Sequence, residues 1–285
     1  MYVIAGATGN VGSVAAERLL AAKEPVRVLV RDEAKGKRFA DQGADVAVGT
    51  LDDEAFVAAA LKGAEGAFLL LPPNFAADDF PAYQRKIADA VSAAVKVSGV
   101  PHVVLLSSIG ADRESGLGPI AGLHYFEGKL RETGTKLSAL RPGYFTENVA
   151  MGLEPARGQG IYPSFMPRDA PMPMVATCDI GTEVARVLLD PPDSSQVVDI
   201  VGPAYTALDV AKQLGERLGK PIDVMPIPPE GWVDAMTQNG VPKHFAELYA
   251  EMYAGFGKGL AQPVGDRLVE GKTSLETVVG GLLAG

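Results

Sequence analysis

Short apolar runs alternate with stretches of helical periodicity along the first half of the chain. The apolar runs predict strands over residues 2–5, 26–30, 45–48, 66–71, 102–107 and 136–140. The periodic stretches predict helices over residues 11–22, 34–42, 53–61, 80–98 and 120–133. Most of these strands are apolar throughout, which suits a parallel sheet covered by helices on both faces. The alternation therefore predicts a doubly wound α/β fold of the Rossmann type.

The second half of the chain is less regular and predicts a smaller, mostly helical part. Residues 158–171, rich in Gly, Pro and aromatic residues, are expected to form a loop. Asp179 is expected to cap a helix over 180–189, and 197–201 to return to the main sheet as a strand. Further helices are expected over residues 231–239 and 244–257 and after Thr273.

These elements predict two parts of the chain. Residues 1–150, with the returning strand 197–201, are expected to form an NAD(P)-binding Rossmann domain. Residues 151–285 are expected to form a C-terminal substrate-binding or lid region. Ligands in such folds bind at the carboxyl ends of the strands.

A glycine-rich loop joins the first predicted strand to the first predicted helix. Its glycines permit a tight turn, a close approach of a diphosphate to the backbone, and close packing of helix on strand. The helix N-terminus then offers free N–H groups to the phosphates. The loop, expected to bind a dinucleotide, consists of Gly6, Ala7, Thr8, Gly9, Asn10, Val11 and Gly12.

The end of the second strand indicates which dinucleotide is bound. Arg31 lies 19 residues beyond Gly12, where NAD-binding proteins carry an acidic residue for the ribose hydroxyls. A guanidinium pairs with a 2′-phosphate, and Lys35, with its basic neighbours, adds positive charge. NADPH is therefore expected rather than NADH, although Asp32 is able to bind a ribose hydroxyl instead.

Together with the loop and Arg31, three further motifs resemble the NmrA-like group of atypical short-chain dehydrogenase/reductases. They are Leu70-Leu71-Pro72-Pro73, Ser107-Ser108 and the run from Leu140 through Arg141-Pro142-Gly143 to Asn148. The resemblance covers nearly the whole chain. It implies NADPH-dependent reduction of quinones or dyes, or nucleotide sensing. The family's Asp after the third strand is replaced here by Thr50, which leaves the adenine contact open.

The resemblance and the strand ends also suggest residues around the cofactor. Leu71 and Pro72 are expected to border the adenosine half, and Ser107 and Phe145 to approach the nicotinamide. Tyr144 follows the sixth strand and is a candidate for the nicotinamide wall. His124 lies one residue from the family's usual histidine position, so it is either a ribose contact or a surface residue. No catalytic residue follows from these motifs.

Tyr125 and Lys129 have the spacing of the short-chain dehydrogenase Tyr-x-x-x-Lys dyad, with Ser108 upstream as a possible third member. Register argues against that role: Glu127 and Leu130 match the family pattern only if the lysine position falls at Leu123. The helix also turns Tyr125 and Lys129 away from its apolar face. We therefore interpret the pair as a solvated one and keep all three residues as weak catalytic candidates.

Composition narrows the class of partner. The net charge is −9 and the pI about 4.9, so neither nucleic acid nor an anionic membrane surface is an expected partner. The single cysteine, Cys178, suits a reducing compartment, and no leader or membrane span is evident, so a cytoplasmic location is expected. Three histidines and one cysteine predict no metal cluster. The sequence does not decide between monomer and homodimer.

These observations predict an NADPH-dependent reductase of quinones or similar small, hydrophobic aromatic acceptors. The alternative is a non-catalytic NAD(P)H sensor that acts through a partner protein, because its motifs would look the same. A third possibility, an isomerase or dehydratase using bound NAD(P), requires the tyrosine dyad whose register is unfavourable here.

Overall fold

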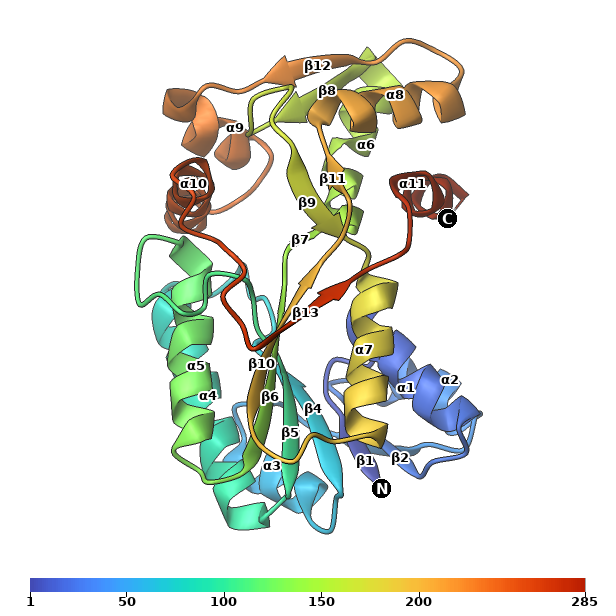
Figure 1. Ribbon diagram of the computed structural model, residues 1–285, viewed down its shortest axis with the longest axis vertical. Coiled ribbons are helices and arrows are strands. Elements are labelled where there is room, and N and C mark those ends of the chain that lie inside the picture. Colours follow the sequence, from blue (N-terminus) through green and yellow to red (C-terminus); the bar gives the residue numbers. More distant parts are fainter. Residues whose placement is uncertain (285) are drawn as a thin grey trace.

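The computed structural model describes residues 1–284 and centres on an eight-stranded sheet (Figure 1). From edge to edge the strand order is β13-β10-β6-β5-β4-β1-β2-β3, and all neighbours are parallel. In chain order these strands are β1 (Tyr2–Ile4), β2 (Val26–Val30), β3 (Asp45–Val48), β4 (Gly66–Leu70), β5 (His102–Leu106), β6 (Lys136–Pro142), β10 (Gln196–Val201) and β13 (Arg267–Glu270). The predicted doubly wound fold is confirmed.

Two layers of helices cover the sheet. One layer consists of α1 (Asn10–Ala21), α2 (Glu33–Ala40) and α7 (Thr177–Leu189), and the other of α3 (Glu54–Leu61), α4 (Phe80–Ser98) and α5 (Ala121–Arg131). Strand β1 shows that the sheet packs against both layers of helices. Tyr2 and Ile4 join the core under the first layer, and Val3 joins the core under the second. This alternation follows from the two-residue period of a strand.

Local capping fixes where several of these helices begin. The carboxylates of Asp32, Asp53 and Asp79 each accept a hydrogen bond from a backbone N–H in the first turn of α2, α3 and α4. Helix α4 ends at Gly99, whose φ of 67° is the left-handed conformation that favours glycine.

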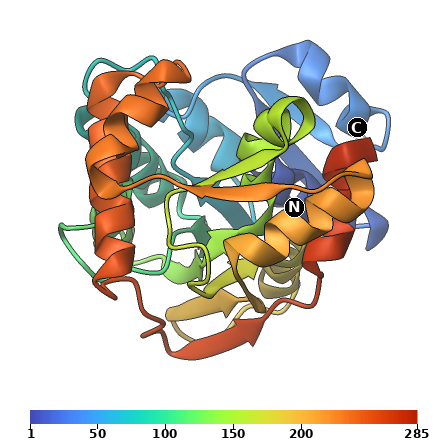
Figure 2. The ribbon, with the colours of Figure 1, turned by 90° about the horizontal axis from the view of Figure 1, so that it is seen from above.

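The remaining elements form a second part above the carboxyl ends of the strands (Figure 1). Its strands are β7 (Tyr144–Phe145), β8 (Ile161–Ser164), β9 (Met172–Val175), β11 (Ala204–Tyr205) and β12 (Asp223–Pro226). Its helices are α6 (Leu153–Gln159), α8 (Ala207–Leu218), α9 (Trp232–Gln238), α10 (Lys243–Gly257) and α11 (Leu275–Ala284), with 3-10 turns at Gly118–Ile120, Thr146–Gly152 and Pro229–Gly231. Figure 2 shows α10 on one side, α8 and α11 on the other, and β12 running between them.

The structure corrects two predictions for the second half and adds one strand. Residues 158–171 are not one loop, because β8 lies within them and pairs with β12. Asp179 does not cap α7: that helix begins at Thr177, and Asp179 instead accepts hydrogen bonds from the N–H and hydroxyl of Thr273. Strand β13, at the edge of the main sheet beside β10, was not predicted. Within residues 1–284, no helix has both the length and the apolar character needed to cross a bilayer.

Candidate active site

The glycine-rich loop after β1 is a tight cradle that side chains would fill. Gly6 has a φ of +63°, and a Cβ there would lie 2.5 Å from Cδ2 of Leu70. A Cβ on Gly12 would lie 2.4 Å from the carbonyl oxygen of Gly6, so only glycine lets α1 begin this close to the turn. The loop therefore has the backbone shape that a diphosphate site requires.

The N-terminus of α1 is open toward solvent. Gly9 occupies the capping position without a side chain, and the first turn carries no acidic residue. Thr8 and Asn10 are exposed, whereas Ala7 and Val11 are buried in the core. Free N–H groups and the positive end of the helix dipole together favour an anion at this point.

Basic side chains lie beside the cradle. Arg31 and Lys35 are exposed, and Arg31 lies close enough to Tyr83 on α4 to oppose the burial that raises the tyrosine's pKa. Arg38 reaches the loop directly, since its Nη2 donates to the carbonyl oxygen of Ala7 at 3.3 Å. Asp32 is occupied as the cap of α2, with Oδ1 2.9 Å from the N–H of Ala34. The acidic residue is therefore used by the backbone, while two arginines remain beside the loop.

The segment after β4 borders the same cradle, because β4 pairs with β1 in the sheet. Leu71 and Pro72 are half-buried there. Farther along this loop, the Nε2–H of His244 on α10 donates to the carbonyl oxygen of Ala77 at 2.8 Å, and Phe245 packs against Phe75. These two contacts fasten α10 to the loop after β4.

Tyr125 and Lys129 are occupied by neighbours on the outer side of α5. The Tyr125 hydroxyl donates to Oδ1 of Asp89 on α4 at 2.8 Å, and this bond raises the pKa of Tyr125. Lys129 pairs with Glu132 at 3.1 Å. An activated tyrosine needs a lowered pKa, so this arrangement is the reverse of a catalytic dyad. Ser108 is half-buried, and its hydroxyl donates to the carbonyl oxygen of Ile109.

A buried ion network, which the sequence did not reveal, ties α5 to the sheet. Both oxygens of Glu127, which is fully buried, accept hydrogen bonds from Arg141 of β6, each 2.8 Å long. Ser107 donates to the same carboxylate at 2.6 Å and Arg131 at 2.7 Å. Burial acts to raise the pKa of Glu127, but these partners hold it below its usual value. The sequence does contain one indication of this network that the motifs did not draw on: Glu127 is a charged residue on the apolar side of its helix.

The other residues expected near the nicotinamide half of the cofactor, His124, Phe145 and Tyr144, do not all face the same side. His124, half-buried, donates from Nδ1 to the carbonyl oxygen of Ala111 at 3.0 Å. Phe145 packs against the core between the sheet and α7. Tyr144 points to the opposite side and lines a large cavity together with Asn148. Of the two aromatic residues after β6, Tyr144 thus faces the cavity.

That cavity, about 500 Å³ in volume, lies between the end of β6 and the helices of the second part. Its walls are mainly apolar, and the lining also includes residues with neutral polar groups: Tyr144, Tyr162, Tyr205, Tyr253, Asn148 and Asn239. Five methionines contribute to the lining: Met151, Met166, Met172, Met174 and Met236. Thioether side chains adapt to differently shaped ligands, so the cavity suits a flat hydrophobic molecule.

Some aromatic side chains of α9 and α10 pack in the interior, and others line the cavity. Trp232 is buried against Tyr253, with ring centroids 5.9 Å apart, and its Nε1–H donates to the carbonyl oxygen of Ile227. Phe245 packs on Phe80 rather than in the cavity. Tyr253 and Met236 line the cavity itself. The helices α9 and α10 therefore supply one wall together with its support.

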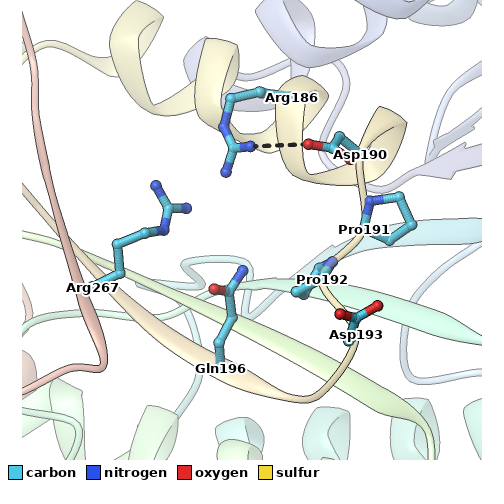
Figure 3. Close-up of a pocket in the computed structure, with 7 residues that line it drawn as sticks. All are labelled: Arg186, Asp190, Pro191, Pro192, Asp193, Gln196 and Arg267. Carbon is cyan, nitrogen blue, oxygen red and sulfur yellow. Dashed lines mark ion pairs between the residues drawn. The ribbon is translucent and has the colours of Figure 1, made fainter.

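A second concavity lies at the opposite end of the sheet (Figure 3). Gln196, the first residue of β10, lines it with Arg186 and Arg267. Both arginines pair with the buried carboxylate of Glu183, and Arg186 also faces Asp190. Ligands of parallel α/β sheets bind at the carboxyl ends of the strands, so this pocket at the amino end of β10 is separate from the candidate active site.

The parallel sheet, the glycine cradle and the position of the cavity define a Rossmann-type α/β protein. Within this class the chain belongs to the NmrA-like family, whose model matches residues 2–278. The family resemblance seen in the sequence is thereby confirmed.

Three relatives are similar over most of their length. The chain is 29% identical to an NAD(P)H azoreductase of Xenophilus azovorans, covering 89% of this chain and 86% of the relative. It is 27% identical to quinone oxidoreductase 2 of Escherichia coli, with coverages of 91% and 89%. The crystal structure of a Citrobacter triphenylmethane reductase complexed with NADP(H) superposes with a TM-score of 0.83 at 24% identity, covering 99% of this chain and 100% of that one.

Proposed function

We propose that this protein is an NADPH-dependent reductase of quinones or similar aromatic electron acceptors. One observation carries the proposal: the glycine cradle for a dinucleotide lies at the carboxyl end of β1, and a largely apolar cavity of about 500 Å³ lies in the second part, which covers the carboxyl ends of these strands. The family, and relatives that reduce azo compounds and quinones, support this reading.

The chain has residues suited to each part of NADPH. The N–H groups at the start of α1 would hold the diphosphate, with Gly9 leaving the approach clear. Arg31 and Arg38 would hold the 2′-phosphate, whereas one carboxylate oxygen of Asp32 is already used to cap α2. This arrangement favours NADPH over NADH. Leu71 and Pro72 would border the adenosine.

When bound, the cofactor supplies a hydride from its nicotinamide ring. The chain then has to orient the acceptor and exclude water. Burial raises the pKa of Tyr144, so its hydroxyl stays protonated and can donate a hydrogen bond to an acceptor oxygen or nitrogen as negative charge develops there. Because the Ser107 hydroxyl is used on Glu127, Ser107 would approach the nicotinamide through its backbone, and Phe145 through its ring.

Binding and turnover can be tested separately. Calorimetry with NADPH and NADH measures binding, and we expect a lower Kd for NADPH. Mixing the protein with NADPH and uncharged quinones, while absorbance at the nicotinamide band is followed, measures turnover. Tight NADPH binding without consumption would favour the sensing protein, and absence of binding would reject both functions.

We further propose that the protein works in a reducing compartment such as the cytoplasm. Cys178 is the only cysteine of the chain, and its thiol lies 3.3 Å from the hydroxyl of Thr273. A lone thiol forms no internal disulfide, so its fold needs no oxidising environment.

A further inference from the structure

The cavity differs from ordinary anion-binding sites in its charge. Within the described residues 1–284, its lining includes no lysine, arginine or histidine. The single charged lining residue is Glu154, whose side chain is 83% exposed and pairs with Arg157 at 3.1 Å. Glu154 therefore marks the rim, and its charge is negative.

Apart from Glu154, the polar residues of the mainly apolar lining carry no charge. Burial raises the pKa values of Tyr144, Tyr162 and Tyr253, so all three are neutral phenols at physiological pH. Phenols and amides can donate hydrogen bonds to a carbonyl or azo group. They do not provide the opposite charge that a sulfonate or carboxylate needs when it leaves water.

The net charge of the whole chain acts in the same direction. The rim ion pair of Glu154 with Arg157 adds no net charge, but the chain carries −9. This net charge lowers the local concentration of an approaching anion and raises that of a cation. A cation with delocalised charge is also weakly hydrated, so it loses less when it leaves water.

We propose that this cavity selects uncharged or delocalised cationic aromatic acceptors and rejects anionic ones. The proposal rests on the reductase function above, and it assigns that function a substrate class by charge. Its determinant is the lack of any cationic side chain among the described lining residues.

A matched pair of acceptors tests the proposal: 1,2-naphthoquinone and its 4-sulfonate, each assayed with saturating NADPH. We expect kcat/KM to be at least about tenfold lower for the sulfonate. The sulfonate withdraws electrons and makes the ring easier to reduce, so ring chemistry would produce the opposite order. Equal or higher kcat/KM for the sulfonate overturns the selectivity. Failure of both acceptors overturns the reductase function instead.

A variant that adds a positive charge to the lining tests whether the cavity determines this selectivity by charge. Asn239 is exposed, lines the cavity and follows the last residue of α9. We expect Asn239→Lys to raise kcat/KM for the sulfonate several-fold relative to the uncharged quinone, and added salt to weaken that gain. Gln238→Lys is the matched control, because Gln238 is the exposed neighbour outside the lining. An equal gain in both variants, or no gain in Asn239→Lys, would show that the residues lining the cavity do not determine the selectivity by substrate charge.

Discussion

Arg141 binds Glu127 through two parallel hydrogen bonds of 2.8 Å between β6 and α5. Because both side chains are buried, removing one charge leaves the other uncompensated. We expect Glu127→Gln to lower the free energy of unfolding by about 3–5 kcal/mol, measured by urea denaturation. Glu132→Gln, an exposed change one residue beyond α5, should cost less than about 1 kcal/mol. Similar losses in the two variants would contradict this role of the network.

Tyr125 bonds to Asp89 on the outer side of the protein. Since its pKa is raised rather than lowered, Tyr125→Phe should retain kcat within about twofold when assayed with NADPH and a quinone. Lys129→Met should behave in the same way, because Lys129 pairs with Glu132. A fall of kcat by two orders of magnitude in either variant would show that Tyr125 and Lys129 do act as a catalytic dyad.

Two glycines of the cradle should respond differently to the same added methyl group. At Gly9 a Cβ would meet only the Gly6 carbonyl oxygen, at 3.4 Å, so Gly9→Ala should cost less than about 1 kcal/mol of stability. Its methyl group would still obstruct a diphosphate, so the NADPH Kd from calorimetry should rise at least about tenfold.

At Gly12 the new Cβ would clash with backbone at 2.4 Å, so Gly12→Ala should destabilise the fold by about 1–3 kcal/mol. Thermal denaturation distinguishes the two variants. Unchanged NADPH affinity in a stable Gly9→Ala protein would show that the ligand does not approach this part of the loop.

Cofactor preference should depend on the arginines beside the cradle. Arg31→Ser and Arg38→Ser should each raise the Kd for NADPH about tenfold more than the Kd for NADH, because only NADPH carries the 2′-phosphate. Lys37 already pairs with Asp41 at 3.0 Å, which makes Lys37→Ser the control. If all three variants change the two affinities in parallel, another group recognises the phosphate.

His102 makes stability depend on pH. Burial, with help from Lys136, lowers its pKa to about 4, and its Nε2 lies 3.0 Å from the Ser138 hydroxyl. The unfolded chain binds a proton near pH 6.5 but the folded chain does not, so stability is lost as pH falls from about 6.5 toward 4. Between pH 7.5 and 5.5, His102 should cost about 1.4 kcal/mol of unfolding free energy. Urea denaturation of His102→Gln should show a loss smaller by that amount, and an equal loss would contradict the assignment.

The sequence predicted the parts of the fold that local patterns determine. Six strands of the sheet have apolar runs, and the apolar periodicity of α5 matches the burial of Phe126 and Leu130, while Tyr125 faces Asp89. That Tyr125 has no catalytic role stays a prediction. Strand β13 was missed because its four residues include two charged ones and it is identified only by pairing with β10. Strand β8 was missed because Pro163 argues against a strand, although proline is tolerated at an edge.

In the candidate site, too, only the part with a local sequence pattern could be predicted. The glycine loop has a local signature, whereas the contact of His244 with Ala77 joins residues 167 positions apart in the sequence. The cavity likewise draws on segments from Tyr144 to Tyr253. Such contacts depend on how the second part folds back over the sheet, and no spacing along the chain encodes them.

The strand that carries Arg141 also leads into the cavity wall at Tyr144, three residues later. The ion network therefore anchors this wall to the sheet. The wall on α9 and α10 rests on an apolar cluster around Trp232 and Tyr253, against which Tyr144 also packs. Helix α10 contributes to that cluster and also contacts the loop after β4 through His244 and Phe245. A change of acceptor made through α10 is therefore also transmitted to the loop that borders the coenzyme.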